Sequence, residues 1–135
     1  MDLGSTPIIV NNPPDAYYDF VYYEWANPVV LLDCVILSIS SDGAVFYDVF
    51  YWGDGFPDDN SNVPSSTEDD EFPINPMVLY GPLQTGILVD VDTTLLSNPP
   101  IGSYRYLKIE APLFCPNDRN DGVEIDAIEV IEVPR

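Results

Sequence analysis

The stretch that decides the fold runs from Val29 to Trp52 and reads VVLLDCVILSIS, SDG, AVFYDVFYW. Its first part is the most apolar run in the chain, and its last part is rich in the aromatic and β-branched residues that favour strands. The Asp42-Gly43 pair between them is a strong signal for a hairpin turn. The stretch therefore predicts two antiparallel strands, over Val29–Ser40 and Ala44–Trp52.

Outside this hairpin the same pattern recurs along the chain. Short apolar or alternating runs are separated by turn formers, and the sequence holds fourteen prolines and eight glycines. Helical periodicity is almost absent. The further strand-like runs are Pro7–Val10, Ala16–Trp25, Met77–Tyr80, Gly86–Asp92, Ser103–Ala111 and Val123–Val133. We therefore predict one all-β domain over residues 1–135, a jelly-roll β-sandwich of about eight mostly antiparallel strands.

The second strand of the hairpin leads into an acidic loop, Trp52–Asn62, which reads WGDGFPDDNSN. Short oxygen-bearing side chains alternate in it, as they do in loops that wrap Ca²⁺. The loop predicts a structural calcium ion with the ligands Asp54, Asp58, Asn60 and Asn62. The same residue types are also ordinary turn formers, and the loop lacks the closing Glu of an EF-hand, so a solvated turn is the alternative.

The charge of the chain restricts its partners. Asp and Glu number 23 against four Lys and Arg, which gives a net charge of −19. Such a field repels phosphate backbones and anionic membranes, so we expect no nucleic-acid partner and no membrane insertion. The chain has no His and no nucleophile motif, and we predict that it is not an enzyme. Carboxylate pairs such as Asp58/Asp59 and Asp69/Asp70 are the catalytic alternative.

The chain has two cysteines, Cys34 and Cys115. They would form one disulfide in an oxidising compartment, or remain two buried thiols. The start at Met1-Asp2-Leu3-Gly4 resembles a boundary placed inside a longer protein.

Several segments carry a family resemblance in their order and spacing. They are DFVYYE (19–24), VILSISSDG (35–43), DVFYWGDG (48–55), YRYLKI (104–109) and GVEIDAIEV (122–130). From about Asp15 to Val133 the chain resembles galactose-binding-like, discoidin-type β-sandwich domains of bacterial extracellular and surface proteins. The resemblance implies a secreted module that binds glycans or other surface ligands through loops and holds a structural calcium ion.

The resemblance also implies particular residues. Asp126, in the last strand-like run, matches a metal-ligand position, while Asp19 and Glu24 lie in the matching early-strand motif and are either ligands or hydrogen-bonding groups. Relatives begin with one more strand than this chain has. We therefore expect that a strand from another segment, or a second copy in a homodimer, completes the sheet.

The leading functional hypothesis is a non-catalytic, extracellular or cell-surface module that binds carbohydrate or a cell-surface polymer. Aromatic rings stack on sugar faces while short polar groups bind hydroxyls. The candidate contacts are Trp52, Asp54, Phe56 and Asn62. Core packing is the alternative for Trp52. A structural or adhesive module that binds another protein is the alternative function.

Overall fold

The computed structural model describes residues 1–26, 28–63, 72–116 and 122–135. Within them one 3-10 helix, Pro76–Val78, accompanies ten strands, and all strand pairs are antiparallel. The prediction of an all-β sandwich is confirmed, while the jelly-roll order of its strands stays a prediction. Asp69/Asp70 lie outside the described residues. In the described parts of the chain no helix is long and apolar enough to cross a membrane.

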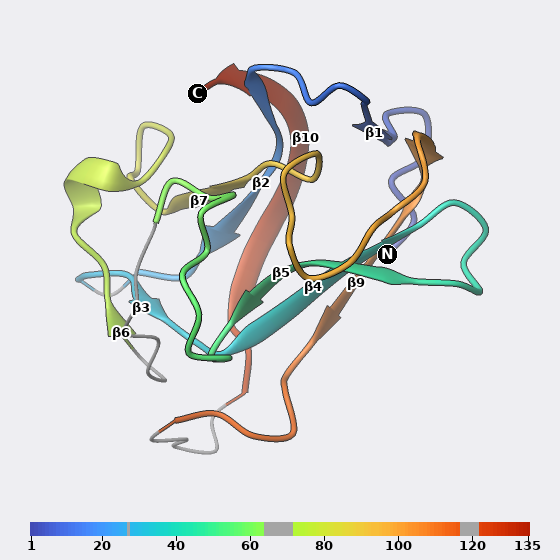
Figure 1. Cartoon of the computed structure of the whole chain (residues 1–135). Coiled ribbons are helices and arrows are strands. Elements are labelled where there is room, and N and C mark those ends of the chain that lie inside the picture. Colours follow the sequence, from blue (N-terminus) through green and yellow to red (C-terminus); the bar gives the residue numbers. More distant parts are fainter. Residues whose placement is uncertain (27, 64–71, 117–121) are drawn as a thin grey trace.

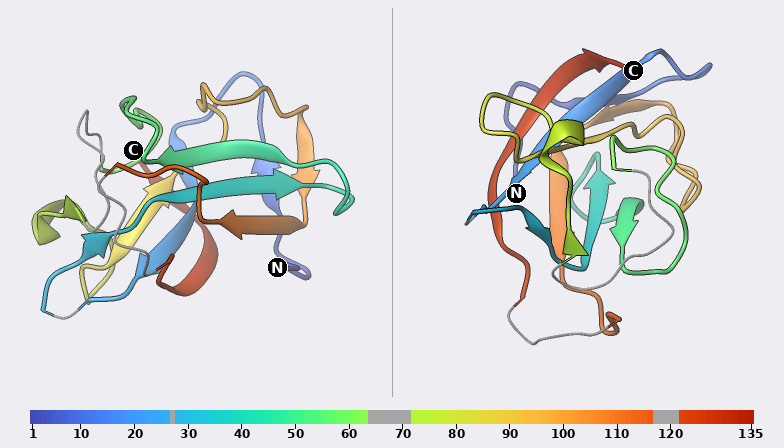
Figure 2. Two further views of the ribbon diagram at one scale, coloured as in Figure 1. Left: turned by 90° about the horizontal axis from the view of Figure 1, so that it is seen from below. Right: turned by 90° about the vertical axis from the view of Figure 1, so that its left-hand side faces the viewer.

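Two three-stranded sheets form the layers of the molecule (Figures 1 and 2). The first has the order β10-β2-β7, with β2 (Tyr17–Glu24), β7 (Gly86–Val89) and β10 (Ile125–Pro134). The second has the order β5-β4-β9, with β4 (Val35–Ser40), β5 (Tyr47–Trp52) and β9 (Tyr106–Glu110). Two small pairs complete the described strands: β1 (Ile8–Val10) with β8 (Gly102–Tyr104), and β3 (Leu31–Leu32) with β6 (Phe72–Pro73).

The core lies between the two sheets. Phe20 and Tyr22 of β2 are fully buried, as are Leu37 and Ile39 of β4. The rings of Tyr22 and Phe50 join the layers, with their centroids 5.7 Å apart. Alternation along β4 places apolar residues in this core, which is why the most apolar predicted strand is central in its sheet.

Three strand predictions need correction. The run Ser103–Ala111 is two strands, β8 and β9, which pair with β1 and β4 in different sheets. The run Val29–Ser40 is two strands, β3 and β4, because Asp33 and Cys34 between them bond to distant parts of the chain. Met77–Tyr80 was expected as a strand, but the 3-10 helix lies there. Pro76 is the first residue of this helix, and the Asn75 side chain caps the helix by accepting from the Met77 N–H.

The amino-terminal residues lie along the outer edge of β9. Leu3 N–H donates to the Arg105 carbonyl at 2.8 Å, and Leu107 N–H donates to the Met1 carbonyl at 3.0 Å. Arg105 also makes a two-pronged ion pair with Asp2. Residues 1–3 of the same chain thus form hydrogen bonds with the backbone at the open edge of β9. Completion of a sheet elsewhere by a homodimer or by a strand from another segment stays a prediction.

Cys34 and Cys115 form a disulfide, with Cα atoms 5.9 Å apart and a sequence separation of 81. The sequence left open a disulfide or two buried thiols, and the structure contains the disulfide. It ties the start of β4 to the segment that follows β9. Gly53 lies directly against it: a Cβ at Gly53 would come within 2.5 Å of the Cys34 Sγ, and the φ of +109° is one that favours glycine.

Candidate functional site

Trp52, the first predicted ligand contact, is a core residue. It is fully buried at the end of β5, and its ring packs on Phe72 with a centroid separation of 5.8 Å. No face of the indole is open to a ligand. The expectation of a stacking platform at Trp52 is therefore corrected in favour of core packing.

Asn62 is a structural clamp. Its Oδ1 accepts from Leu88 N–H at 2.7 Å, and its Nδ2 donates to the carbonyls of Val78 at 2.8 Å and Gly86 at 3.2 Å. These bonds fasten the end of the acidic loop to β7. These backbone bonds account for Asn62 without a ligand, and its predicted roles in binding a cation and a sugar stay predictions.

Asn60 plays a similar part in the interior. It is buried, and its Nδ2 donates to the carbonyls of Val49 and Asp90 at 2.8 and 2.9 Å. The side chain thus connects the acidic loop to β5 and to the residue that follows β7. The side chains of Asn60 and Asn62 thus position the backbone, which explains part of the oxygen-rich pattern without a cation.

The other predicted residues of the loop meet at a hollow. It has a volume of about 250 Å³. Its lining is Asp54, Phe56, Pro57, Asp58, Asp59 and Asn60 from the acidic loop, with Thr93, Leu95 and Leu96 from the segment after β7. Phe56 is 72% exposed and Leu95 is 90% exposed. We call this group the Phe56 hollow: apolar side chains are open to solvent here beside carboxylates.

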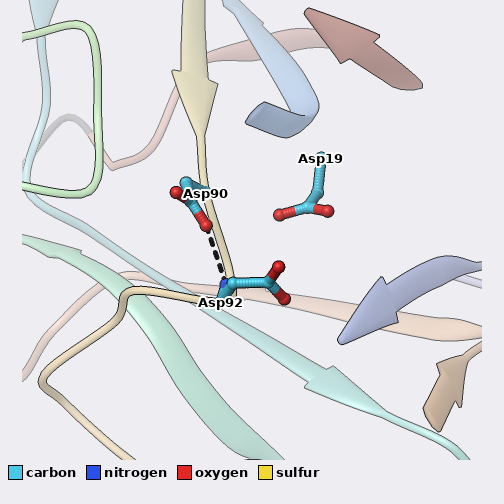
Figure 3. A group of neighbouring side chains, drawn as sticks. All are labelled: Asp19, Asp90 and Asp92. Carbon is cyan, nitrogen blue, oxygen red and sulfur yellow. Dashed lines mark hydrogen bonds between the residues drawn. The ribbon is translucent and has the colours of Figure 1, made fainter. Parts of the chain in front are cut away.

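A second group, the Asp19 cluster, lies between β2 and the end of β7 (Figure 3). One carboxylate oxygen from each of Asp19, Asp90 and Asp92 lies within 4.8 Å of the other two. Sequence analysis missed Asp90 and Asp92 because about 70 positions separate them from Asp19. The alternation of Asp90 and Asp92 after a buried strand was the available signal.

Neighbouring donors hold the Asp19 cluster together. Asp90 accepts from Arg135 Nη1 at 2.7 Å and from Asp92 N–H at 2.8 Å. Asp92 accepts from the N–H groups of Asn11 and Asp15, and Asp19 accepts from Val91 N–H at 2.8 Å. Burial, followed by the charges of Asp92 and Asp90, raises the pKa of Asp19 to about 8.

A third group, the Glu24 cluster, forms where β2 ends and β10 begins. Asp126, the residue expected from the family resemblance, is exposed here and does not line the Phe56 hollow. Glu24 pairs with Ile125 across the sheet and is only 1% exposed. Burial, followed by the charges of Asp33, Glu124 and Asp126, raises the pKa of Glu24 to about 8. Asp33 was missed by sequence analysis, because only the fold brings it beside Glu24.

Comparisons of the chain with protein-family models, with curated proteins and with solved structures find no match. The structure brings Asp54, Phe56, Asp58 and Asn60 together, but places Trp52, Asn62 and Asp126 elsewhere.

Proposed function

We propose that the protein is a non-catalytic binding module of the galactose-binding-like, discoidin-type kind, which acts outside the cell or at its surface. Its ligand is a carbohydrate or another cell-surface polymer, and a calcium ion stabilises its fold. The observation that carries the proposal is the exposed phenyl ring of Phe56 beside the carboxylates of the Phe56 hollow.

The hollow has the chemistry that a sugar ring requires. Exposed apolar surface at Phe56 and Leu95 matches the C–H face of a pyranose, whereas Asp54 and Asp59 supply acceptors for hydroxyl groups. Asp54 Oδ1 accepts from Phe56 N–H at 2.8 Å, which holds the loop in the conformation that presents the ring. The volume suits a small part of a glycan, such as one terminal residue.

The charge of the protein narrows the glycan class. With a net charge of −19, the surface repels sulfated, phosphorylated and uronic-acid-rich polymers at long range. Neutral glycans escape this penalty, and their hydroxyls donate to carboxylates. We therefore propose a neutral oligosaccharide or polysaccharide as the ligand.

The test is binding to an array of neutral and acidic glycans, followed by calorimetric titration of the best neutral binder. Phe56→Ala should weaken the affinity by about tenfold or more, which is the effect expected of a central aromatic contact. Phe114→Ala is the matched control, because Phe114 is exposed to a similar degree (75%) but does not line the hollow.

An adhesive role is the second candidate, and the apolar rim made by Phe56, Leu95 and Leu96 also suits a protein partner. Absence of binding to every neutral glycan would contradict carbohydrate recognition. Equal affinities of the Phe56→Ala and parent proteins would remove the Phe56 hollow from the proposal.

A further inference from the structure

Another hollow, with a volume of about 400 Å³, lies between the amino-terminal segment and β10. It is lined by residues around β1, by Asp19 of β2, and by Val130, Ile131 and Glu132 of β10. Ile9 of β1 lines it as well and is 43% exposed, so we call it the Ile9 hollow. Among the described residues it shares no lining residue with the Phe56 hollow, and it is therefore a separate site.

An irregularity in β10 brings three consecutive side chains to this hollow. The register with β2 shifts between Val130 and Val133, so Ile131 and Glu132 have no Cα partner across the strand pair. Consecutive residues of a regular strand point to opposite faces, whereas a bulge redirects side chains. The Ile9 hollow thus receives two apolar groups and one carboxylate from a single strand.

Asp19 is the buried acid of the Ile9 hollow. It is only 7% exposed, and its Oδ2 accepts from Val91 N–H at 2.8 Å. Its Oδ1 has no hydrogen-bond partner among the described residues. A buried carboxylate is costly unless a cation or further donors replace its lost hydration. A donor that enters the hollow therefore finds an unused acceptor in its wall.

The described part of the chain provides no cation for this carboxylate. Three of the four basic side chains pair with other acids: Arg105 with Asp2, Lys108 with Glu110, and Arg135 with Asp90. The fourth, Arg119, lies outside the described residues. The neighbours that act on Asp19 electrostatically are instead like charges, those of Asp92, Asp90 and Asp15. A positive group from outside the chain would be stabilised in this position.

We propose that the Ile9 hollow receives a lysine or arginine side chain of a protein partner. Such a side chain joins an apolar stem to a cationic head. The stem matches Ile9, Val130 and Ile131, and the head matches the carboxylates of Asp19 and Glu132. The inference concerns protein binding, the second candidate function, and does not depend on carbohydrate recognition at the Phe56 hollow.

Charge favours a basic partner over a second copy of this chain. With a net charge of −19, two copies repel each other, whereas a basic protein is attracted at long range. The basic side chains that the structure describes are already held in ion pairs, so a second copy has none of these to offer. The partner is thus a protein segment that displays Lys or Arg beside apolar residues.

The test is a fluorescence anisotropy titration of chelator-treated protein against short labelled peptides with one central Lys or Arg. Matched peptides carry Gln at that position. The titration is run at about pH 8.5, because the pKa of Asp19 is about 8 while Lys and Arg remain charged. Replacement of Lys or Arg by Gln should weaken binding by about tenfold or more, since the buried carboxylate then lacks its cation.

Variants of the protein locate the binding site. Asp19→Asn keeps the shape, removes the charge and should weaken binding of the Lys and Arg peptides by about tenfold. Glu132→Gln, at an exposed position, tests the hollow without touching a buried residue and should weaken binding by about two- to threefold. The matched control is Glu129→Gln: Glu129 is on the same strand, accepts from the Tyr23 hydroxyl and does not line the hollow. It should bind as the parent does.

Three outcomes would overturn the proposal: no binding of any Lys or Arg peptide at millimolar concentrations, equal affinities for the Lys, Arg and Gln peptides, or equal losses in Asp19→Asn and Glu129→Gln. Spermine is titrated in parallel. If spermine binds as tightly as the best peptide, the occupant is a free polyamine and the protein partner is wrong. Phe56→Ala should retain peptide binding, so a failure of carbohydrate recognition and a failure of the Ile9 hollow give different results.

Discussion

Gly53 shows how one residue can be required by two constraints at once. Its backbone has φ of +109°, and the disulfide sulfur of Cys34 occupies the space that a side chain would need. Substitution therefore combines backbone strain with a steric clash against atoms that a cross-link holds in place.

Gly53→Ala should lower the free energy of unfolding by about 3 kcal/mol or more, as overpacking and strain add. The matched control is Gly55→Ala: it also has positive φ, but a Cβ there meets nothing within 4 Å. The control should cost about 1–2 kcal/mol, for the backbone alone. Urea unfolding measures the loss of unfolding free energy in both variants. Equal losses would show that the disulfide shifts to make room for the added methyl group.

At the scale of elements, the acidic loop is fixed to the sheets by amide side chains. Asn62 makes three hydrogen bonds to the backbone at 78, 86 and 88, across the connection that leads into β7. Its role is the same whether or not a cation is bound.

Asn62→Ala should therefore lower the free energy of unfolding by about 2–4 kcal/mol, since about 1 kcal/mol is lost per bond and a buried backbone donor is orphaned. The cost should be equal in calcium and in chelator when urea unfolding is followed in each. Asn98→Ala, at an exposed position, is the control and should be nearly neutral. A cost that appears only with calcium would make Asn62 a metal ligand after all.

Local patterns along the chain predicted most elements. The alternation and turn residues predicted β1, β2 and β10 nearly to their ends, whereas β5 begins at Tyr47 rather than at Ala44. The division of Val29–Ser40 into β3 and β4 was not predictable, because it depends on bonds from Asp33 and Cys34 to partners about 80 to 90 positions away. The 3-10 helix at Pro76–Val78 was predictable in principle, since Asn75-Pro76 is a capping pattern that outweighs a short apolar run.

The candidate sites were less predictable than the strands, for the same reason. Asp54 and Phe56 lie near each other in sequence and were identified, whereas the Asp19 and Glu24 clusters draw residues from strands far apart in the chain. The sequence left Trp52 open between a ligand contact and core packing, because a strand end can present a ring to solvent or to the core. The packing of Trp52 on Phe72 decides for the core.

For the whole molecule, buried acids control the response to pH. Burial raises the pKa values of Asp19 and Glu24 to about 8, from ordinary values of 3.8 and 4.5. The native state therefore holds these protons more tightly than the unfolded chain. The stability that they contribute is complete below the ordinary values and is lost as pH rises through about 8. The carboxyls of Asp2 and Asp42, whose pKa values are lowered, act only at more acidic pH.

In chelator, the melting temperature should fall by several degrees between pH 5 and pH 8. A protein stabilised by ionised carboxylates would show the opposite trend, a rise of the melting temperature over this range. Scanning calorimetry over this pH range measures the effect, and the double variant Asp19→Asn with Glu24→Gln should give a flatter profile. A melting temperature that rises toward pH 8 without calcium would contradict the assignment.

The disulfide also has a mechanical consequence. A pulling force applied at the two ends of the chain passes from Cys34 to Cys115 through the cross-link, so the chain between them, across a sequence separation of 81, bears no load. At roughly 3.5 Å per extended residue, about 280 Å of chain stays folded back when the rest is stretched. The central strands β4, β5 and β9 and the Phe56 hollow all lie within that span. Under tension the molecule would thus keep these strands and the loop that carries Phe56 out of the line of force.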